Sequence, residues 1–246
     1  MLLGDAAHTA HYSIGSGTKL AMEDAIALVA AIRAASSLEQ ALQAYEAGRR
    51  PAVEHLQAVA VRSQRWWDSF PKRMHLPVNQ LLVSYMTRAG KVSLTRFAET
   101  TPQVVRRSLA EYSGASPGRV ACDDLVDWVI GQPWPLEHAV LPSRASRPGW
   151  PIGDVEVTEP DAWGTKADGL VDQVAGQLAD GVAAVRLTGP GDRDAVLDRL
   201  DLAERLRLQL GAVTIVRAPE RCRADLAAGL VSARTDLIDL SAGESS

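Results

Sequence analysis

Cysteine is scarce in this chain of 246 residues, which contains two, Cys122 and Cys222. They are far apart and no His or Cys accompanies either at metal-ligand spacing, so the sequence predicts buried thiols and neither a disulfide framework nor a zinc site. Long hydrophobic runs are also missing. The longest, such as residues 25–32, fall well short of the ~20 residues of a transmembrane helix. No charged and apolar leader opens the chain. We therefore expect a cytoplasmic protein without a membrane partner.

The composition is that of a globular protein, with 46% hydrophobic and 23% charged residues, which excludes a disordered tail. Charge is unevenly distributed. Residues 1–150 carry 16 Lys and Arg against 13 Asp and Glu, whereas residues 151–246 carry 10 against 17. Between Arg49 and Arg107, 11 basic residues accompany three acidic ones. This stretch either attracts an anionic partner or forms a solvated helix face with counter-charges from elsewhere in the fold. We expect no nucleic-acid partner.

The first half of the chain has the hydrophobic periodicity of helices. A short apolar run at residues 1–3 is expected to end a strand. After it, apolar spacing, serine caps and proline positions predict helices over 17–35, 38–46, 51–70, 78–89 and 102–112.

The second half of the chain lacks this uniform helical periodicity. Residues 128–163 contain six prolines and four tryptophans but no sustained period, which indicates a connecting segment held by aromatic anchors. Helices and strands then alternate, which favours parallel βα units and a small open sheet or partial barrel. The expected elements are helix 167–179, strand 182–187, helix 193–210, strand 212–216, helix 221–230 and strand 237–240. The fold class is thus α/β, with a mostly helical domain 1–118, a connecting segment 119–163 and a degenerate βα domain 164–246.

The most distinctive segment covers residues 4–25. It combines a carboxylate at Asp5, a loop with His8 and His11, a glycine-rich turn at 15–17 and the start of a helix. Glycines let a backbone approach a ligand closely, and the amides and positive dipole of a helix start stabilise negative charge. On spacing alone, a tight turn with a local Asp cap explains the pattern equally well. A metal site at the two histidines is disfavoured, because no further ligands accompany them.

The whole segment resembles the second FAD-binding motif of the flavoprotein aromatic hydroxylases, the para-hydroxybenzoate hydroxylase-like monooxygenases. It has their Gly-Asp-Ala-Ala-His, Gly-x-Gly and Glu-Asp elements. It departs from the general pattern at Tyr12, where Pro is usual, and at Lys19, where Asn is usual. Both departures are similar to the subgroup that acts on aromatic acyl-CoA thioesters, such as salicylyl-CoA 5-hydroxylase and anthraniloyl-CoA monooxygenase. The resemblance covers residues 1–114 and corresponds to the C-terminal part of a hydroxylase.

The resemblance implies roles for individual residues. Asp5 would hold the ribityl and pyrophosphate region of FAD. Amides of the glycine-rich turn would approach the pyrimidine edge of the flavin ring, where a helix start stabilises the charge of the reduced form. Lys19 either adds positive charge there or points to solvent. The expected cofactor-binding residues are Gly4, Asp5, Gly15, Gly17 and Thr18. His11 and Tyr12 either line the flavin or substrate cavity or pack the loop. Glu23 and Asp24 suit the helix dipole and are interpreted as structural.

Two arginines offer a site for CoA phosphates. Arg62 and Arg65 lie beside Trp66 and Trp67 on one expected helix, where guanidinium groups and stacking surfaces together suit phosphates and adenine. Alternatively, the tryptophans are core or interface anchors and the arginines are solvated.

The fingerprint that binds the ADP half of FAD is not found, since Gly189-Pro190-Gly191 is a poor match. The last βα units are faintly similar to an old-yellow-enzyme-like flavin reductase barrel. The resemblance therefore implies a fragment or split subunit of an FAD-dependent monooxygenase that hydroxylates an aromatic substrate, an acyl-CoA thioester, with NAD(P)H and O2. A separate chain would carry the N-terminal hydroxylase half, without which this chain is inactive. No catalytic side chain and no metal are expected. The alternative is a non-catalytic relic or scaffold module.

Overall fold

The computed structural model describes residues 2–120, 124–135, 140–146 and 148–241. The chain divides into two compact units, Met1–Phe70 and Pro71–Ser246. Cys222 is a buried free thiol, whereas Cys122 lies outside the described residues. Within those ranges, no helix has the length and apolar character needed to cross a membrane.

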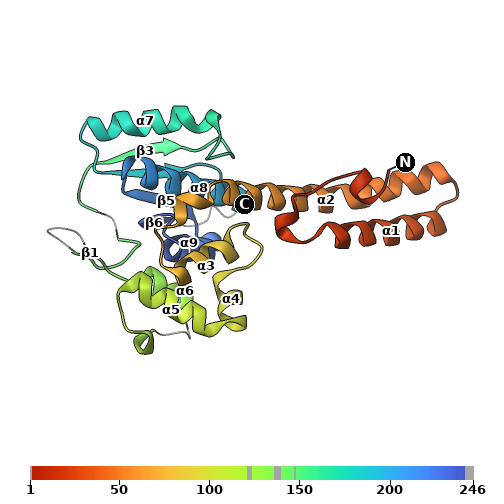
Figure 1. Ribbon diagram of the computed structural model, residues 1–246. Coiled ribbons are helices and arrows are strands. Elements are labelled where there is room, and N and C mark those ends of the chain that lie inside the picture. Colours follow the sequence, from red (N-terminus) through yellow and green to blue (C-terminus); the bar gives the residue numbers. More distant parts are fainter. Residues whose placement is uncertain (1, 121–123, 136–139, 147, 242–246) are drawn as a thin grey trace. The chain divides into compact units, whose positions relative to one another are not determined.

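The first unit is a helical hairpin (Figure 1). Helices α1 (Gly17–Ala34) and α2 (Leu38–Asp68) run antiparallel, and the Ser37 side chain caps α2 by accepting a hydrogen bond from a first-turn amide. Two short 3-10 turns precede α1, namely η1 (Gly4–Ala6) and η2 (Tyr12–Ile14). This arrangement confirms that the start of the chain is mostly helical.

Two expectations for this unit are wrong. The helices predicted over 38–46 and 51–70 form one helix, α2, with Pro51 inside it. A proline removes one backbone hydrogen bond, but α2 continues through it, with Ala41 before it and Val53 after it both buried. Residues 2 and 3, the described part of the strand predicted at residues 1–3, form no strand either. Leu3 has extended backbone angles, but the described part of this unit contains no strand with which it could pair.

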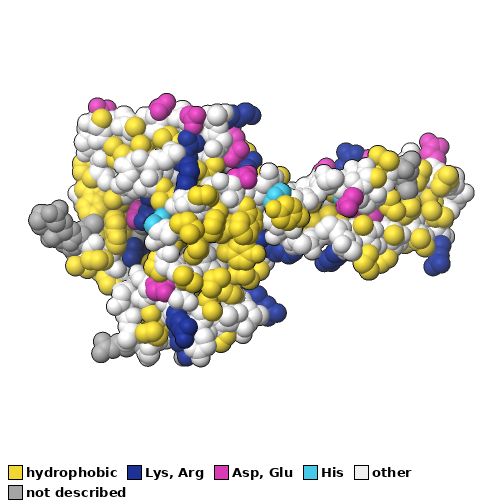
Figure 2. All heavy atoms as spheres, viewed as in Figure 1, with side chains coloured by type: hydrophobic (Ala, Val, Ile, Leu, Met, Phe, Trp, Pro, Cys, Tyr) yellow, Lys and Arg dark blue, Asp and Glu magenta, His cyan; other side chains and the backbone are white. Residues whose placement is uncertain are grey.

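One face of α1 is apolar and exposed. Figure 2 shows hydrophobic side chains, in yellow, gathered on this unit. Four large side chains at helical spacing are each between 47% and 69% exposed: Met22, Ile26, Val29 and Ile32. The buried side chains of α1 are Leu20 and Asp24. The periodicity thus predicts the helix correctly but not the face that is buried.

The second unit contains a four-stranded parallel sheet in the order β3-β4-β5-β6 (Figure 1). Helices connect successive strands, so the sheet consists of three consecutive βαβ units. The elements are β3 (Ile152–Glu156), η5 (Thr165–Ala167), α7 (Asp168–Ala179), β4 (Ala184–Thr188), α8 (Arg193–Leu210), β5 (Thr214–Pro219), η6 (Glu220–Cys222), α9 (Arg223–Val231) and β6 (Leu237–Ser241). The α/β class and the parallel organisation are confirmed.

Strand β3 is one of the elements that the sequence misses, because it falls in the expected connecting segment. Pro151 precedes it and Gly153 lies inside it, and both residue types are depleted in strands. They are tolerated here because β3 is at the edge of the sheet, where Ile152 pairs with Ala184 of β4. The aromatic anchors of the segment are confirmed. In and beside the hairpin of β1 (Trp134–Pro135) and β2 (Val140–Leu141), the Trp134 and Trp150 rings are 6.5 Å apart and pack against the sheet residues Ala184, Ile215 and Leu237.

Further helices complete the second unit: α3 (Val78–Thr87), α4 (Leu94–Thr100), α5 (Pro102–Ser113) and α6 (Leu125–Ile130), with 3-10 turns η3 (Phe70–Arg73) and η4 (Pro117–Arg119). The sequence does not predict α4 or α6. These helices share one core with the βα region, in which Val83 and Leu109 are clustered with Val185 and Leu226. The compact unit therefore begins at Pro71, whereas the sequence places a domain boundary after residue 118.

Candidate functional site

Gly4 brings the N-terminal turn against helix α1. Its φ of +57° is rare for residues with a side chain, and a Cβ at this position would lie 3.1 Å from the Cβ of Ala21. The backbone conformation and the close approach therefore both require glycine. The next residue, Asp5, is thereby brought to the start of α1.

The carboxylate of Asp5 lies beside the first turn of α1. A Cβ added to Gly17 would be 3.9 Å from Asp5 Oδ1. The Asp5 side chain is exposed and makes no hydrogen bond or ion pair with any other described residue. Its oxygens are thus available as acceptors for a ligand.

The turn before α1 leaves backbone amides without a side-chain cap. Gly15 ends η2 with φ of +62°, and no atom lies within 4 Å of the position that its Cβ would take. Ser16 is the N-cap residue of α1, but its hydroxyl donates to the Ile14 carbonyl at 3.2 Å and does not cap the helix. Thr18, in the first turn, is exposed. The Gly15 amide donates to the Tyr12 carbonyl at 2.9 Å, whereas the first amides of α1 lack the side-chain partner that usually satisfies a helix start.

A buried carboxylate lies next to the N-terminal turn. The side chain of Asp24, on α1, is 0% exposed. Its Oδ2 accepts hydrogen bonds from the Gly4 amide at 3.2 Å and from His8 Nε2 at 2.6 Å, while its Oδ1 accepts one from Arg49 Nε at 2.9 Å. Arg49 also donates to Glu23 at 3.2 Å. One carboxylate therefore joins the turn, α1 and α2.

These contacts determine the ionisation of Asp24. Burial alone would raise the pKa of this carboxyl group, but hydrogen bonds from Arg49, His8 and the Gly4 amide outweigh burial and hold the pKa below its ordinary value. For Tyr45, burial and the charge of Asp24 both raise the pKa of its phenol and outweigh the opposing charge of Arg49. Asp24 is thus an anion at neutral pH, balanced by Arg49.

The loop with His11 and Tyr12 is fastened to α2. Ser13 Oγ lies 2.8 Å from His11 Nδ1 and 2.7 Å from Ser63 Oγ. The His11 and Tyr12 rings have centroids 4.4 Å apart, and Tyr12 is 86% exposed. His11 thus has the loop-packing contacts that one alternative predicts, and it also lines a cavity.

Two cavities flank this loop along α2. One of about 610 Å³ is lined by His8, Tyr45 and Arg49 together with apolar side chains that include Leu2 and Val53. The other, of about 500 Å³, is lined by Thr9, Ala10, His11, Gln57, Val61 and Gln64. Gln57 lines both cavities, and its Nε2 donates to the Thr9 carbonyl at 2.9 Å.

The two expected CoA-binding arginines line neither of these cavities. Arg62 is 7% exposed and Arg65 is partly exposed. Trp66 is buried and packs edge-on against Trp67 with centroids 5.2 Å apart. These positions support the alternative in which Trp66 is a core anchor. That alternative also expects both arginines to be solvated, and the burial of Arg62 contradicts this part of it.

Several basic side chains between Arg49 and Arg107 pair with acidic side chains of the fold. The ion pairs include Arg49 with Asp24 and Glu23, Arg50 with Glu46, Arg73 with Glu204, and Arg96 with Glu99. Lys19 likewise pairs with Glu23, at 3.5 Å, and its side chain is 78% exposed, which favours the solvent-facing alternative. In the described ranges, no three His, Cys, Asp or Glu side chains gather as a metal site would require.

Sequence reasoning missed the cluster of Asp24, His8 and Arg49. Two of its members lie in the distinctive segment, whose pattern predicts only a helix-dipole role for Asp24. Arg49 is 25 residues further along the chain, and only the hairpin brings it to Asp24. Next to this cluster, the exposed Asp5 carboxylate can accept hydrogen bonds from hydroxyl groups of a ligand. The uncapped amides at the start of α1 suit an anionic edge of the same ligand.

The chain is related in sequence to aromatic monooxygenases. It is 50% identical over 93 residues to 3-hydroxy-4-methyl-anthranilyl-(aryl-carrier protein) 5-monooxygenase of Streptosporangium sibiricum, a match that covers 38% of this chain and 26% of that protein. It is 49% identical over 100 residues to salicyloyl-CoA 5-hydroxylase of a Streptomyces species, covering 38% and 19%. Protodeoxyviolaceinate monooxygenase of Chromobacterium violaceum is 33% identical over 109 residues, covering 44% and 29%. These relatives confirm the resemblance to the aromatic hydroxylase subgroup.

The chain spans less than a third of the length of each of these relatives. No family model matches it, and no solved structure matches it.

Proposed function

We propose that residues 1–70 supply part of the FAD site of an aromatic monooxygenase. The observation that carries this proposal is the exposed Asp5 carboxylate beside the uncapped start of α1, in a chain whose relatives are aromatic monooxygenases. The rest of the site would come from polypeptide that corresponds to the unmatched part of those relatives. In this proposal the chain is a fragment or a split subunit of the enzyme.

The residues present fit FAD. Asp5, which has no partner among the described residues, would accept hydrogen bonds from the ribityl hydroxyls. Gly15 and Gly17 leave the backbone accessible, and the Thr18 amide lies in the uncapped first turn of α1. The positive end of this helix would stabilise negative charge at the pyrimidine edge of the ring. Bound FAD would supply the redox chemistry, taking electrons from NAD(P)H and activating O2 for hydroxylation of the aromatic ring.

We further propose an aromatic acyl thioester as substrate. The names of two relatives give an anthranilyl group on an aryl-carrier protein and salicyloyl-CoA, each an aromatic acid joined to a carrier. The loop with His11, which is fixed to α2 through Ser13 and Ser63, would line the cavity for the ring. Arg65 is the better candidate for a CoA phosphate, because Arg62 is buried.

A chimera tests this function. The matching segment of the Streptomyces salicyloyl-CoA 5-hydroxylase is replaced by the corresponding residues of this chain. We expect the purified chimera to retain FAD, measured by visible flavin absorption, and to consume NAD(P)H faster when salicyloyl-CoA is added. A folded chimera without flavin, when the unmodified hydroxylase retains it, would favour the relic alternative. A flavin-bearing chimera that does not respond to the thioester would contradict only the substrate.

A further inference from the structure

We infer that Asp24 is a positioning residue, whose buried carboxylate holds the segment from Gly4 to His8 in the conformation that brings Asp5 to the start of α1. Both ends of this segment bind the same oxygen, Oδ2 of Asp24, through the Gly4 amide at 3.2 Å and His8 Nε2 at 2.6 Å. The candidate ligand residue lies between these two anchors. The inference rests on the FAD function proposed above.

Among the described residues, no hydrogen bond or ion pair of its own side chain holds Asp5 in place. Its side chain is exposed and makes no hydrogen bond or ion pair with the rest of the described chain, so its position depends on the backbone on either side. The His8 ring also has few hydrogen bonds to hold it, since its Nδ1 is buried and has no hydrogen-bond partner among the described atoms. The contact of its Nε2 with Asp24 therefore fixes the orientation of the ring.

Arg49 makes the buried anion possible. Its Nε donates to Asp24 Oδ1 at 2.9 Å, whereas the turn binds the other oxygen, so Oδ2 stays available for the two anchors. A buried carboxylate without a cation would become protonated and lose an acceptor site. Glu23 also pairs with Arg49, but it is 39% exposed and its other ion pair is with Lys19 on α1 rather than with the segment from Gly4 to His8. This difference provides a matched control.

The test compares Asp24→Asn with Glu23→Gln. Each substitution removes one carboxylate from Arg49, but only Asp24→Asn also removes the anchor of the turn. We expect Asp24→Asn to accelerate hydrogen exchange of the Gly4 amide in the full chain, and to weaken FAD binding by the chimera, each by about tenfold or more, as the loss of a charge-assisted hydrogen bond predicts. Glu23→Gln should change neither quantity.

His8→Ala keeps the test decisive if Asp24→Asn unfolds the hairpin, because it leaves the pair of Asp24 and Arg49 intact and removes one anchor. It should weaken FAD binding with unchanged helical circular dichroism. Faster Gly4 exchange with unaltered FAD affinity would overturn the inference, and so would equal losses in Asp24→Asn and Glu23→Gln. A chimera that binds no FAD before any substitution would instead refute the proposed function, while the Gly4 exchange rate would still report whether Asp24 anchors the turn.

Discussion

Removal of Arg73 should strongly destabilise the second unit. Arg73 donates from Nε to Glu204 Oε1 at 2.8 Å and from Nη2 to Oε2 at 2.5 Å, and the two side chains are only 1% and 4% exposed. Arg73→Met would leave the Glu204 carboxyl group buried without this partner, which typically costs about 3–5 kcal/mol. Since Glu204 lies on α8, the pair joins the start of this unit to its βα region.

The loss of unfolding free energy caused by Arg73→Met should depend on pH. Burial raises the pKa of Glu204 above its ordinary value, although Arg73 opposes this effect. A carboxyl group with a higher pKa in the folded than in the unfolded state binds more protons when folded, so its contribution to stability falls as pH rises. Without Arg73 the pKa of Glu204 rises further. The destabilisation by Arg73→Met should therefore be smaller at about pH 5 than at about pH 8.

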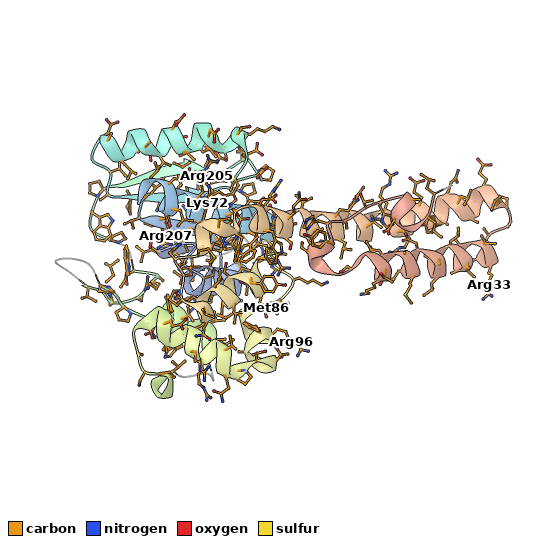
Figure 3. All side chains as sticks on the ribbon, viewed as in Figure 1. Arg33, Lys72, Met86, Arg96, Arg205 and Arg207 are labelled. Atoms are coloured by element: carbon orange, nitrogen blue, oxygen red, sulfur yellow. The ribbon has the colours of Figure 1, made fainter. Side chains whose placement is uncertain are left out.

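Urea unfolding of the full chain, followed by circular dichroism and tryptophan fluorescence, measures this cost. Arg96 is the control, because it projects from α4 (Figure 3) and pairs with Glu99 at 2.7 Å, with side chains 68% and 56% exposed. Arg96→Met should change the unfolding free energy by no more than about 0.5 kcal/mol. Replacing both Arg73 and Glu204 by apolar residues should recover much of the loss. If Arg73→Met cost no more than Arg96→Met, the reasoning would be refuted.

Pro51→Ala should raise the melting temperature, because it restores the backbone hydrogen bond that proline removes from α2; a lower melting temperature would indicate two separate helices. The first unit should lose stability as pH falls below about 4, since the pKa of Asp24 is lower in the folded than in the unfolded state. Acid titration by circular dichroism measures this loss, which should be smaller in Asp24→Asn. The full chain should not bind FMN saturably in a fluorescence titration, because at the end of β5 Pro219 lacks an amide donor and Glu220 repels phosphate; saturation at micromolar FMN would contradict this.

The βα region is predicted well from sequence because local signals define its helices. Helix α8 begins at Arg193 and ends at Leu210 as predicted, since Asp192 caps its first turn and Gly211, with φ of +64°, ends it. Strand β3 has no such signal. It forms because a neighbouring strand is present to pair with it, which residue periodicity does not reveal.

The candidate site likewise has some features that local sequence signals predict and others that depend on tertiary contacts. The proximity of Asp5 to the turn at 15–17 involves residues close in sequence, and the segment that contains them has a recognisable pattern. The contact of Asp24 with Arg49 depends on the α1 and α2 hairpin, and the continuity of α2 through Pro51 depends on packing on both sides of the proline. Neither could be predicted from local patterns, because each is determined by tertiary contacts.

The affinity of the chimera for FAD with and without Asp5→Asn tests the central claim most directly. Asparagine keeps the size of the side chain but removes the charge with which Asp5 would accept hydrogen bonds from the ribityl hydroxyls. We predict that Asp5→Asn weakens FAD binding by about tenfold or more, while Asp68→Asn, at an exposed carboxylate that ends α2, leaves it unchanged. Equal FAD affinity in the Asp5→Asn chimera and the unsubstituted chimera would contradict the assignment of this turn to the cofactor.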